Sequence, residues 1–177
     1  RRVAFSSDYA VTEMHDGSRV GPPESLSEFE SGLLATTPLP HAASRLAPRF
    51  DYDRRRARVR FALEHLSDHA GGDRPVFVFA HLLCPHPPFV FGPRGENVYP
   101  PGPFTAVVSY EDYVRGYRDQ VRFVNSVLPA VVDKILQRST TPPVIVILGD
   151  HGSGSTFLLE GTRSITPRTM RERLCPL

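Results

Sequence analysis

With 177 residues, 40% of them apolar and 23% charged, the chain has the length and composition of one globular domain with a sizeable core. A formal net charge of +2 and a single short basic block, Arg54 to Arg56, exclude a strongly basic nucleic-acid-binding protein. Cys84 and Cys175 form neither a metal-binding spacing nor a disulfide framework, and no apolar run reaches the ~20 residues of a membrane span. Because the chain begins without Met and stops in an unfinished segment, we expect it to be a piece of a longer protein.

The first fifty residues are expected to hold one strand and one helix. Residues 2–6 (RVAFS) predict a short strand that enters a loop at 7–16. Ser25 or Ser27 can cap a helix, because serine oxygens accept hydrogen bonds from the first amides of a helix. This helix should end before Pro38.

A second helix is expected to begin at Asp51 or Asp53 and to end near Ser67. One buried face is predicted by apolar residues at helical spacing, namely Val59, Ala62, Leu63 and Leu66. Five arginines fall mostly off this face and predict a solvated basic surface, or alternatively a surface for an anionic partner: Arg54, Arg55, Arg56, Arg58 and Arg60.

Residues 76–83 (VFVFAHLL) predict a second strand with two apolar faces, so helices should cover both. His81 lies inside this run, and the favoured interpretation from the residues is a core histidine bonded to the backbone. The strand leads into a turn at 84–88 (CPHPP), where prolines on both sides restrict the backbone of His86. The same prolines make a nucleophilic pair of Cys84 and His86 awkward.

A long loop rich in Gly and Pro follows at 90–107, a length that is usually functional or disordered. Ser109 with Asp112 matches a capping box and predicts a long helix that extends to about Gln137. Pro129 should kink this helix or divide it. The apolar stripe of the helix consists of Tyr113, Tyr117, Val121, Val124, Leu128, Val131, Val132 and Ile135.

The apolar run at 144–148 (VIVIL), after two prolines, predicts a strand buried on both faces, as in a parallel sheet. The order strand, helices, strand, helix, strand is typical of an α/β layered fold with right-handed crossovers. A partly flexible loop should follow residue 153, and residues 170–177 should lead into a further strand.

Asp150 and His151 come directly after the predicted strand at 144–148, at the end where ligands bind in open α/β sheets. A carboxylate oxygen and an imidazole nitrogen suit Mn²⁺ or Zn²⁺. The alternative is a turn in which Asp150 caps the next helix and His151 has no role, and the residues alone leave both open. His86 follows the other strand, so it can converge with this pair and contact a phosphoryl or sulfuryl oxygen or the leaving group.

Four stretches together resemble the sulfatase-like branch of the alkaline phosphatase superfamily: HLLCPHPPF (81–89), YVRGYRDQVRFVN (113–125), PPVIVILGDHGSGS (142–155) and RERL (171–174). They are most similar to membrane-anchored sulfatase-like proteins related to lipoteichoic acid synthases and phosphoglycerol transferases. The resemblance covers about residues 75–174. It implies a three-layer α/β/α fold with a mainly parallel central sheet, and it makes residues 1–177 one incomplete catalytic domain that lacks its nucleophile segment and its C-terminal strands.

The resemblance also implies roles for particular residues. Asp150 and His151 would bind a divalent metal, with Mn²⁺ or Zn²⁺ the first expectation and Mg²⁺ or Ca²⁺ the alternatives. His86 would lie near the phosphate or sulfate, and His81, which matches a recurrent histidine of the close relatives, is a second candidate for substrate binding. The family's nucleophile and its first acidic metal ligand would lie upstream of residue 1, so no catalytic nucleophile is expected in this chain.

We therefore expect part of a metal-dependent sulfatase-like hydrolase or transferase that acts on phosphoryl, phosphoglycerol or sulfuryl esters. Its substrate would be an anionic ester, free or linked to lipid or glycan. Its parent would be membrane-anchored with an extracytoplasmic catalytic domain, and the fragment alone would be inactive. The missing nucleophile supports an alternative, a truncated non-catalytic relative that serves as a binding or interaction domain. A third reading is an unrelated α/β domain.

Overall fold

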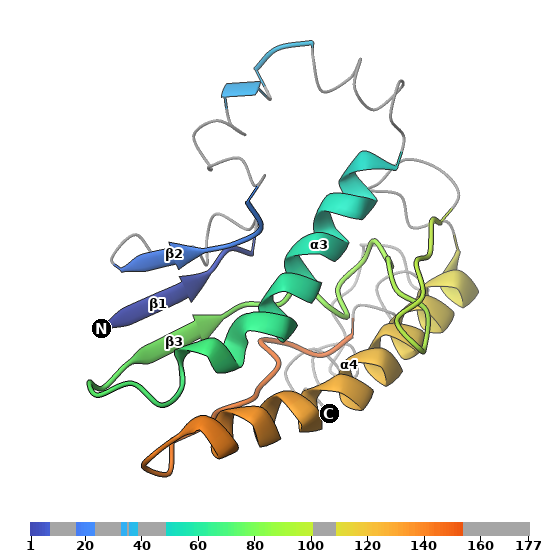
Figure 1. Ribbon diagram of the computed structural model, residues 1–177. Helices are drawn as coiled ribbons and strands as arrows, with labels where there is room; N and C mark the ends of the chain where they lie inside the picture. The colour runs from blue at the N-terminus through green and yellow to red at the C-terminus, as the bar shows by residue number, and fades with distance from the viewer. Residues whose placement is uncertain (8–16, 24–32, 35, 39–48, 101–108, 154–177) are drawn as a thin grey trace.

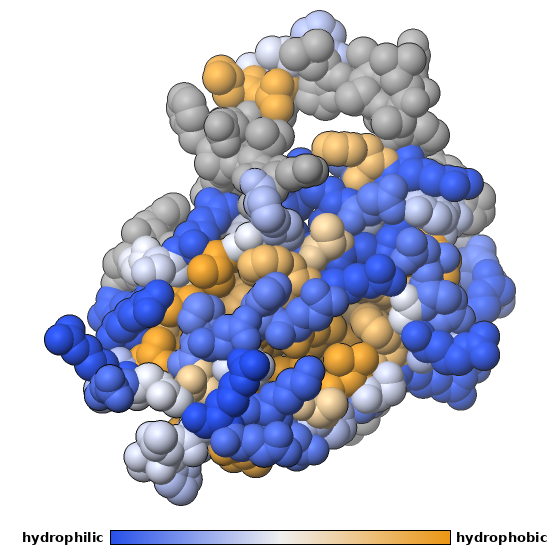
Figure 2. Space-filling model, in the orientation of Figure 1, coloured by the Kyte–Doolittle hydropathy of each residue, from blue (hydrophilic) through white to orange (hydrophobic). Residues whose placement is uncertain are grey.

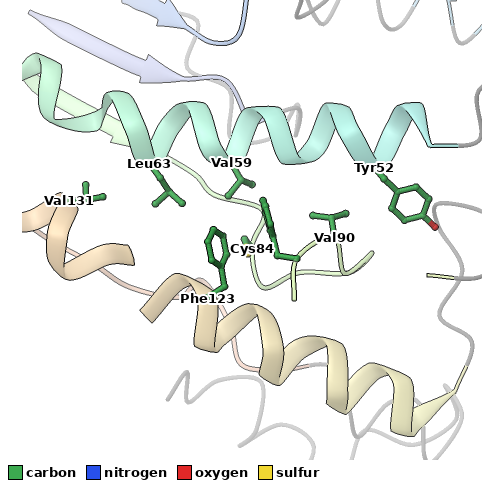
Figure 3. Close-up of a cluster of buried hydrophobic side chains, with 8 residues drawn as sticks. Tyr52, Val59, Leu63, Cys84, Val90, Phe123 and Val131 are labelled. Carbon is green, nitrogen blue, oxygen red and sulfur yellow. The ribbon is translucent and has the colours of Figure 1, made fainter. Parts of the chain in front are cut away.

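The computed structural model describes residues 1–7, 17–23, 33–34, 36–38, 49–100 and 109–153 (Figure 1). Its elements, in chain order, are β1 (Arg2–Phe5), β2 (Ser18–Val20), α3 (Phe50–His65), the short 3₁₀ helix η2 (Leu66–His69), β3 (Phe77–Ala80) and α4 (Tyr110–Arg138). Figures 1 and 3 both show α3 between the strands and α4. The described chain is therefore an α/β structure, as the sequence predicts at this coarse level.

The three strands form one parallel sheet in the order β2-β1-β3. β1 is the central strand, and Val3, which pairs with Ser18 on one side and Val78 on the other, has none of its surface exposed. The predicted strand at 2–6 is confirmed, whereas β2 was not predicted because three residues (SRV) carry no recognisable pattern. Parallel pairing brings the carboxyl ends of all three strands to one edge of the sheet.

The helix predicted from Asp51 or Asp53 to Ser67 is confirmed as α3, with its last residues continuing as η2. Two buried clusters meet α3 from opposite sides. Ala62 packs with β1 against the sheet, while Val59 and Leu63 face α4 and the chain after β3 (Figure 3). Gly71, at φ +79°, follows η2 in a conformation that favours glycine.

The predicted solvated arginine surface is wrong for two of its five members. Arg56 and Arg58 are only 2% and 4% exposed. Nη1 of Arg56 donates to the carbonyl oxygens of Val90 and Val98, each at 2.9 Å, and the guanidinium lies 4.3 Å from the ring centre of Tyr99. A guanidinium can be buried where carbonyls and an aromatic ring replace water, and helical spacing alone does not reveal such partners.

The described part of the loop at 90–107 is a packed element rather than a disordered one. Val90 and Phe91 are each 1% exposed, and Phe91 lies against the ring of Phe123 with centroids 4.5 Å apart. Oε1 of Gln120 accepts hydrogen bonds from the amides of Val90 at 2.8 Å and Phe91 at 3.2 Å. The loop is therefore fixed by side chains from both α3 and α4.

The strand predicted at 76–83 is observed only at Phe77–Ala80, as β3. Val78 and Ala80 pack toward α3, which confirms one apolar face. Phe77 on the other face is 56% exposed, so the expectation that helices cover both faces is wrong on that side. His81 stands just beyond the strand rather than inside it.

α4 confirms the predicted long helix and its cap. The Oγ of Ser109 accepts from the amide of Asp112 at 3.0 Å and donates to its Oδ2 at 2.9 Å. Of the two predicted effects of Pro129, a kink or a division, the division is wrong, because the helix continues without interruption through this residue. Its buried residues are Tyr113, Gln120, Phe123 and Val131. The predicted apolar stripe included Tyr113 and Val131 but not Gln120 or Phe123.

The segment 144–148 departs furthest from expectation. It forms no ladder within the described part of the chain, and Val144, Val146, Ile147 and Leu148 are 92%, 72%, 61% and 75% exposed. Figure 1 shows the chain turning back after α4 into this extended segment. The predicted doubly buried strand is therefore wrong here, because a strand needs a hydrogen-bonded neighbour and a layer on each face.

The helix expected to begin at Ser25 or Ser27, most of the loop at 7–16, the segment at 170–177 and Cys175 lie outside the described residues. Among the residues that are described, none of the helices is both long and apolar enough to cross a bilayer.

Candidate functional site

The candidate site residues lie on segments that follow strands or a helix end. His81 and His86 come after β3, and Asp150 and His151 come after the exposed segment at 144–148. Parallel pairing places the residues after β1 and β3 at one edge of the sheet. Two groupings result, one around His86 and His151 and one around His81.

Asp150 and His151 form a short, self-braced unit. The amide of His151 donates to Oδ1 of Asp150 at 3.1 Å, and Oδ2 lies 3.7 Å from Nε2 of the imidazole. Nδ1 of His151 lies 2.7 Å from the carbonyl oxygen of Gly152. Since a carbonyl only accepts, Nδ1 donates, and in the neutral ring Nε2 carries the lone pair. This is the tautomer in which Nε2 can bind a metal.

His86 is arranged in the same way. Its Nδ1 lies 2.5 Å from the carbonyl oxygen of Pro87, so Nδ1 donates and Nε2 carries the lone pair in the neutral ring. Burial lowers the pKa of His86, and the charges of Arg55 and His151 lower this pKa further, while Asp150 raises it. His86 therefore lies within electrostatic reach of the Asp150–His151 unit.

Arg55 braces the turn that holds His86, a role that was not predicted from the sequence. Its Nη1 donates to the carbonyl oxygen of Pro87 at 2.8 Å and reaches that of His86 at 3.4 Å. α3 thereby fixes the turn after β3. The basic block at Arg54 to Arg56 was visible in the sequence, but nothing in it separates a brace from a solvated side chain.

Cys84 begins the same turn but is unsuited to nucleophilic chemistry. It is a free cysteine, 8% exposed, and burial raises the pKa of its thiol to about 12. The thiolate is therefore scarce at neutral pH. This agrees with the expectation from its proline neighbours.

Asp150 and His151 fit a divalent cation in donor type but supply only two ligands. Two metal–ligand bonds of about 2.1 Å span at most about 4.2 Å, so atoms 3.7 Å apart can touch one ion. Catalytic zinc sites usually have three protein ligands. The residues that the structure describes contain no group of three or more histidine, cysteine, aspartate or glutamate side chains able to hold a metal.

His81 belongs to a different grouping. It is half-buried and lines a small cavity with Ser6, Ser7 and arginines of α3. The interpretation as a histidine within an apolar strand is therefore wrong, because β3 ends at Ala80.

Comparison with protein-family models found no match, and searches of curated proteins and of solved structures found none either. The resemblance to sulfatase-like enzymes therefore stays a prediction from the ordered motifs.

Proposed function

We propose that the chain is part of a metal-dependent sulfatase-like hydrolase or transferase that acts on phosphoryl, phosphoglycerol or sulfuryl esters. The observation that carries the proposal is that His86 lies within electrostatic range of Asp150 and His151, although the segments are about 60 residues apart in the sequence. In both His86 and His151, Nδ1 donates to a backbone carbonyl oxygen, so the lone pair of the neutral ring is on Nε2. For His151, the proposed ligand, this is the second-shell pattern common at metal-binding histidines.

The proposal includes the finer predictions of fold and location. The three described strands would be part of a larger, mainly parallel sheet in a three-layer α/β/α domain. The parent protein would be membrane-anchored, with this domain outside the cytoplasm. Asp150 and His151 would then share the metal with ligands from outside the described residues.

In this proposal Asp150 Oδ2 and His151 Nε2 hold the cation, with Mn²⁺ or Zn²⁺ expected first. When bound, the metal would supply Lewis acidity at a phosphoryl or sulfuryl oxygen. Nε2 of His86 would contact a non-bridging oxygen or the leaving group. An anionic oxygen or a leaving group needs a proton on Nε2, so His86 would act there as the imidazolium, which a bound anion favours although burial lowers the pKa of the ring. Arg55 holds the turn in place and adds positive charge beside the anion.

The experiment is a calorimetric titration of the purified chain with Mn²⁺ and Zn²⁺. The double variant Asp150→Ala/His151→Ala should lose the binding that the wild type shows. The matched control is His65→Ala/Asp68→Ala, which removes another partly exposed pair, 2.7 Å apart at the end of α3. Equal binding in the wild type and the Asp150/His151 variant, or loss only in the control, would overturn the proposal.

A non-catalytic interaction domain is the second candidate. Two observations favour it: the side chain of Asp150 is 71% exposed, and the described residues offer a metal only the two ligands Asp150 and His151. Failure of the metal titration would favour this candidate.

A further inference from the structure

Two stretches of the described chain lack a partner strand, one on a single side and one on both. β3 lies at the end of the sheet order β2-β1-β3, so its second edge pairs with no strand in the described part of the chain. In a parallel ladder alternate residues bond to one neighbour only, so the remaining backbone groups of β3 point outward from this edge. Residues 144–148 pair with no described strand on either side.

Both stretches are apolar and uncharged. Residues 76–80 (VFVFA) and 144–148 (VIVIL) contain no polar or charged side chain. Val76 and Phe77 are exposed beside the free edge, and four of the five residues at 144–148 are more than half exposed. Figure 2 shows apolar side chains at the surface among the hydrophilic ones. Natural edge strands usually carry charges or prolines that prevent pairing with another chain, and neither stretch contains one.

The two stretches do not pair with each other within one chain. Val144 is 92% exposed, which pairing with β3 and packing on the sheet would not allow. The link from α4, residues 139–143 (STTPP), is short and ends in two prolines, each of which fixes its own φ and restricts the residue before it. A short, stiff link of this kind favours exchange between copies over folding back onto the same chain.

A second copy of the chain supplies the complement of both stretches. If 144–148 of each copy pairs with β3 of the other, the same contact occurs twice and closes with twofold symmetry. Burial of one Val, Ile, Leu or Phe side chain removes roughly 60–120 Å² from water. The six exposed apolar side chains of each copy therefore provide an interface on the order of 1,000 Å², about the size at which specific interfaces begin.

We infer that the chain forms a reciprocal homodimer in which residues 144–148 of each copy add to the free edge of β3 in the other. Each three-stranded sheet thereby gains a fourth strand, and backbone hydrogen bonds and apolar contacts hold the copies together. This pairing does not depend on metal binding by Asp150 and His151. An interface of this size gives association in the micromolar range, so measurements well below such concentrations report on the monomer.

The test is sedimentation equilibrium of the purified chain in EDTA, over a range of about 1 to 200 µM. We expect the mass to rise from one chain to two. Val146→Lys and Phe77→Lys each place a charge in one of the two stretches and should weaken the association at least about tenfold, because an unpaired charge is costly to bury. Leu136→Lys on α4 is the control, since it adds the same charge at an apolar residue that is 48% exposed and belongs to neither stretch.

Reciprocal pairing requires that both variants lose the dimer while the control keeps it. Loss in Val146→Lys alone would mean that two copies of 144–148 pair with each other, and loss in Phe77→Lys alone that two β3 edges do. Either result would overturn the inference, as would a monomer at every concentration, particles larger than two chains, or equal weakening by Leu136→Lys. Circular dichroism checks that each variant is folded, and Val144→Lys and Val76→Lys replace a variant that is not.

Discussion

The loop at 90–100 and the segment at 142–153 differ in burial, and the difference is the reverse of what their compositions suggest. The loop contains glycines and prolines, yet Val90 and Phe91 are buried and hydrogen-bonded. The other segment contains the apolar run 144–148, in which four of five residues are β-branched, yet Val144 is 92% exposed. Exposure therefore follows the partners that each segment meets rather than its own hydropathy.

The partners of the loop are polar as well as apolar. Arg56 and Gln120 satisfy its backbone from α3 and α4, and Phe123 covers Phe91. Residues 144–148, by contrast, pair with no strand in the described part of the chain. Burial becomes favourable only when the polar backbone is hydrogen-bonded at the same time.

The largest expected effect comes from the core of the loop. Phe91→Ala should lower the free energy of unfolding by roughly 3–5 kcal/mol, because it removes a fully buried ring and leaves a cavity against Phe123. Phe77→Ala, at a ring that is 56% exposed, is the control and should cost clearly less. Urea denaturation followed by circular dichroism measures both, and equal losses would contradict the assignment of the loop to the core.

Gln120→Ala tests the hydrogen bonds that fix the loop at 90–100. It leaves the amides of Val90 and Phe91 buried without an acceptor, so we expect a loss of about 2–4 kcal/mol in unfolding free energy. Gln137→Ala, at an exposed position of the same helix, should change this free energy by less than about 0.5 kcal/mol. If the two variants unfold at the same urea concentration, the hydrogen bonds do not hold the loop.

The loop at 90–100 and the segment at 142–153 can be compared directly by making the same substitution, valine to alanine, in each. Val90→Ala should cost roughly 1–3 kcal/mol of unfolding free energy. Val144→Ala should cost less than about 0.5 kcal/mol, since that side chain is almost fully exposed. A large loss at Val144 would show that this segment is buried in solution, as the sequence predicted.

The smallest expected effect is a dependence of stability on pH. Burial lowers the pKa of both His86 and His69 below the usual 6.5. The unfolded chain then binds more protons than the folded chain just below pH 6.5, so stability is full above this pH and declines as pH falls through the folded pKa values. Unfolding free energies measured at pH 7.5 and 5.5 should show the decline, and His86→Gln with His69→Gln should reduce it.

The helices were largely predictable because their signals are local. The cap formed by Ser109 and Asp112 and the apolar spacing along α3 act within one or two turns, and both helices begin and end within a few residues of their predicted bounds. Gln120, by contrast, is a polar residue on a helix face, and its burial depends on amides about 30 residues away.

For the candidate site, the sequence singled out His86, Asp150 and His151 by their place after apolar runs. The structure adds the tautomers, because the acceptors at Pro87 and Gly152 are backbone carbonyls that no pattern of residue types reveals. It also adds Arg55 and separates His81 from the others. The metal and substrate roles stay predictions, to be decided by the titrations above.

The sequence by itself determined what depends on neighbours along the chain, namely the α/β class, the two long helices and the proline-framed turn around His86. Tertiary structure decided which side chains are buried. Arg58 was expected in solvent and lies in a basic pocket, while Val144 was expected in a sheet and lies in solvent. The physical reason is that burial of a charge or of a strand depends on partners that come from distant parts of the chain.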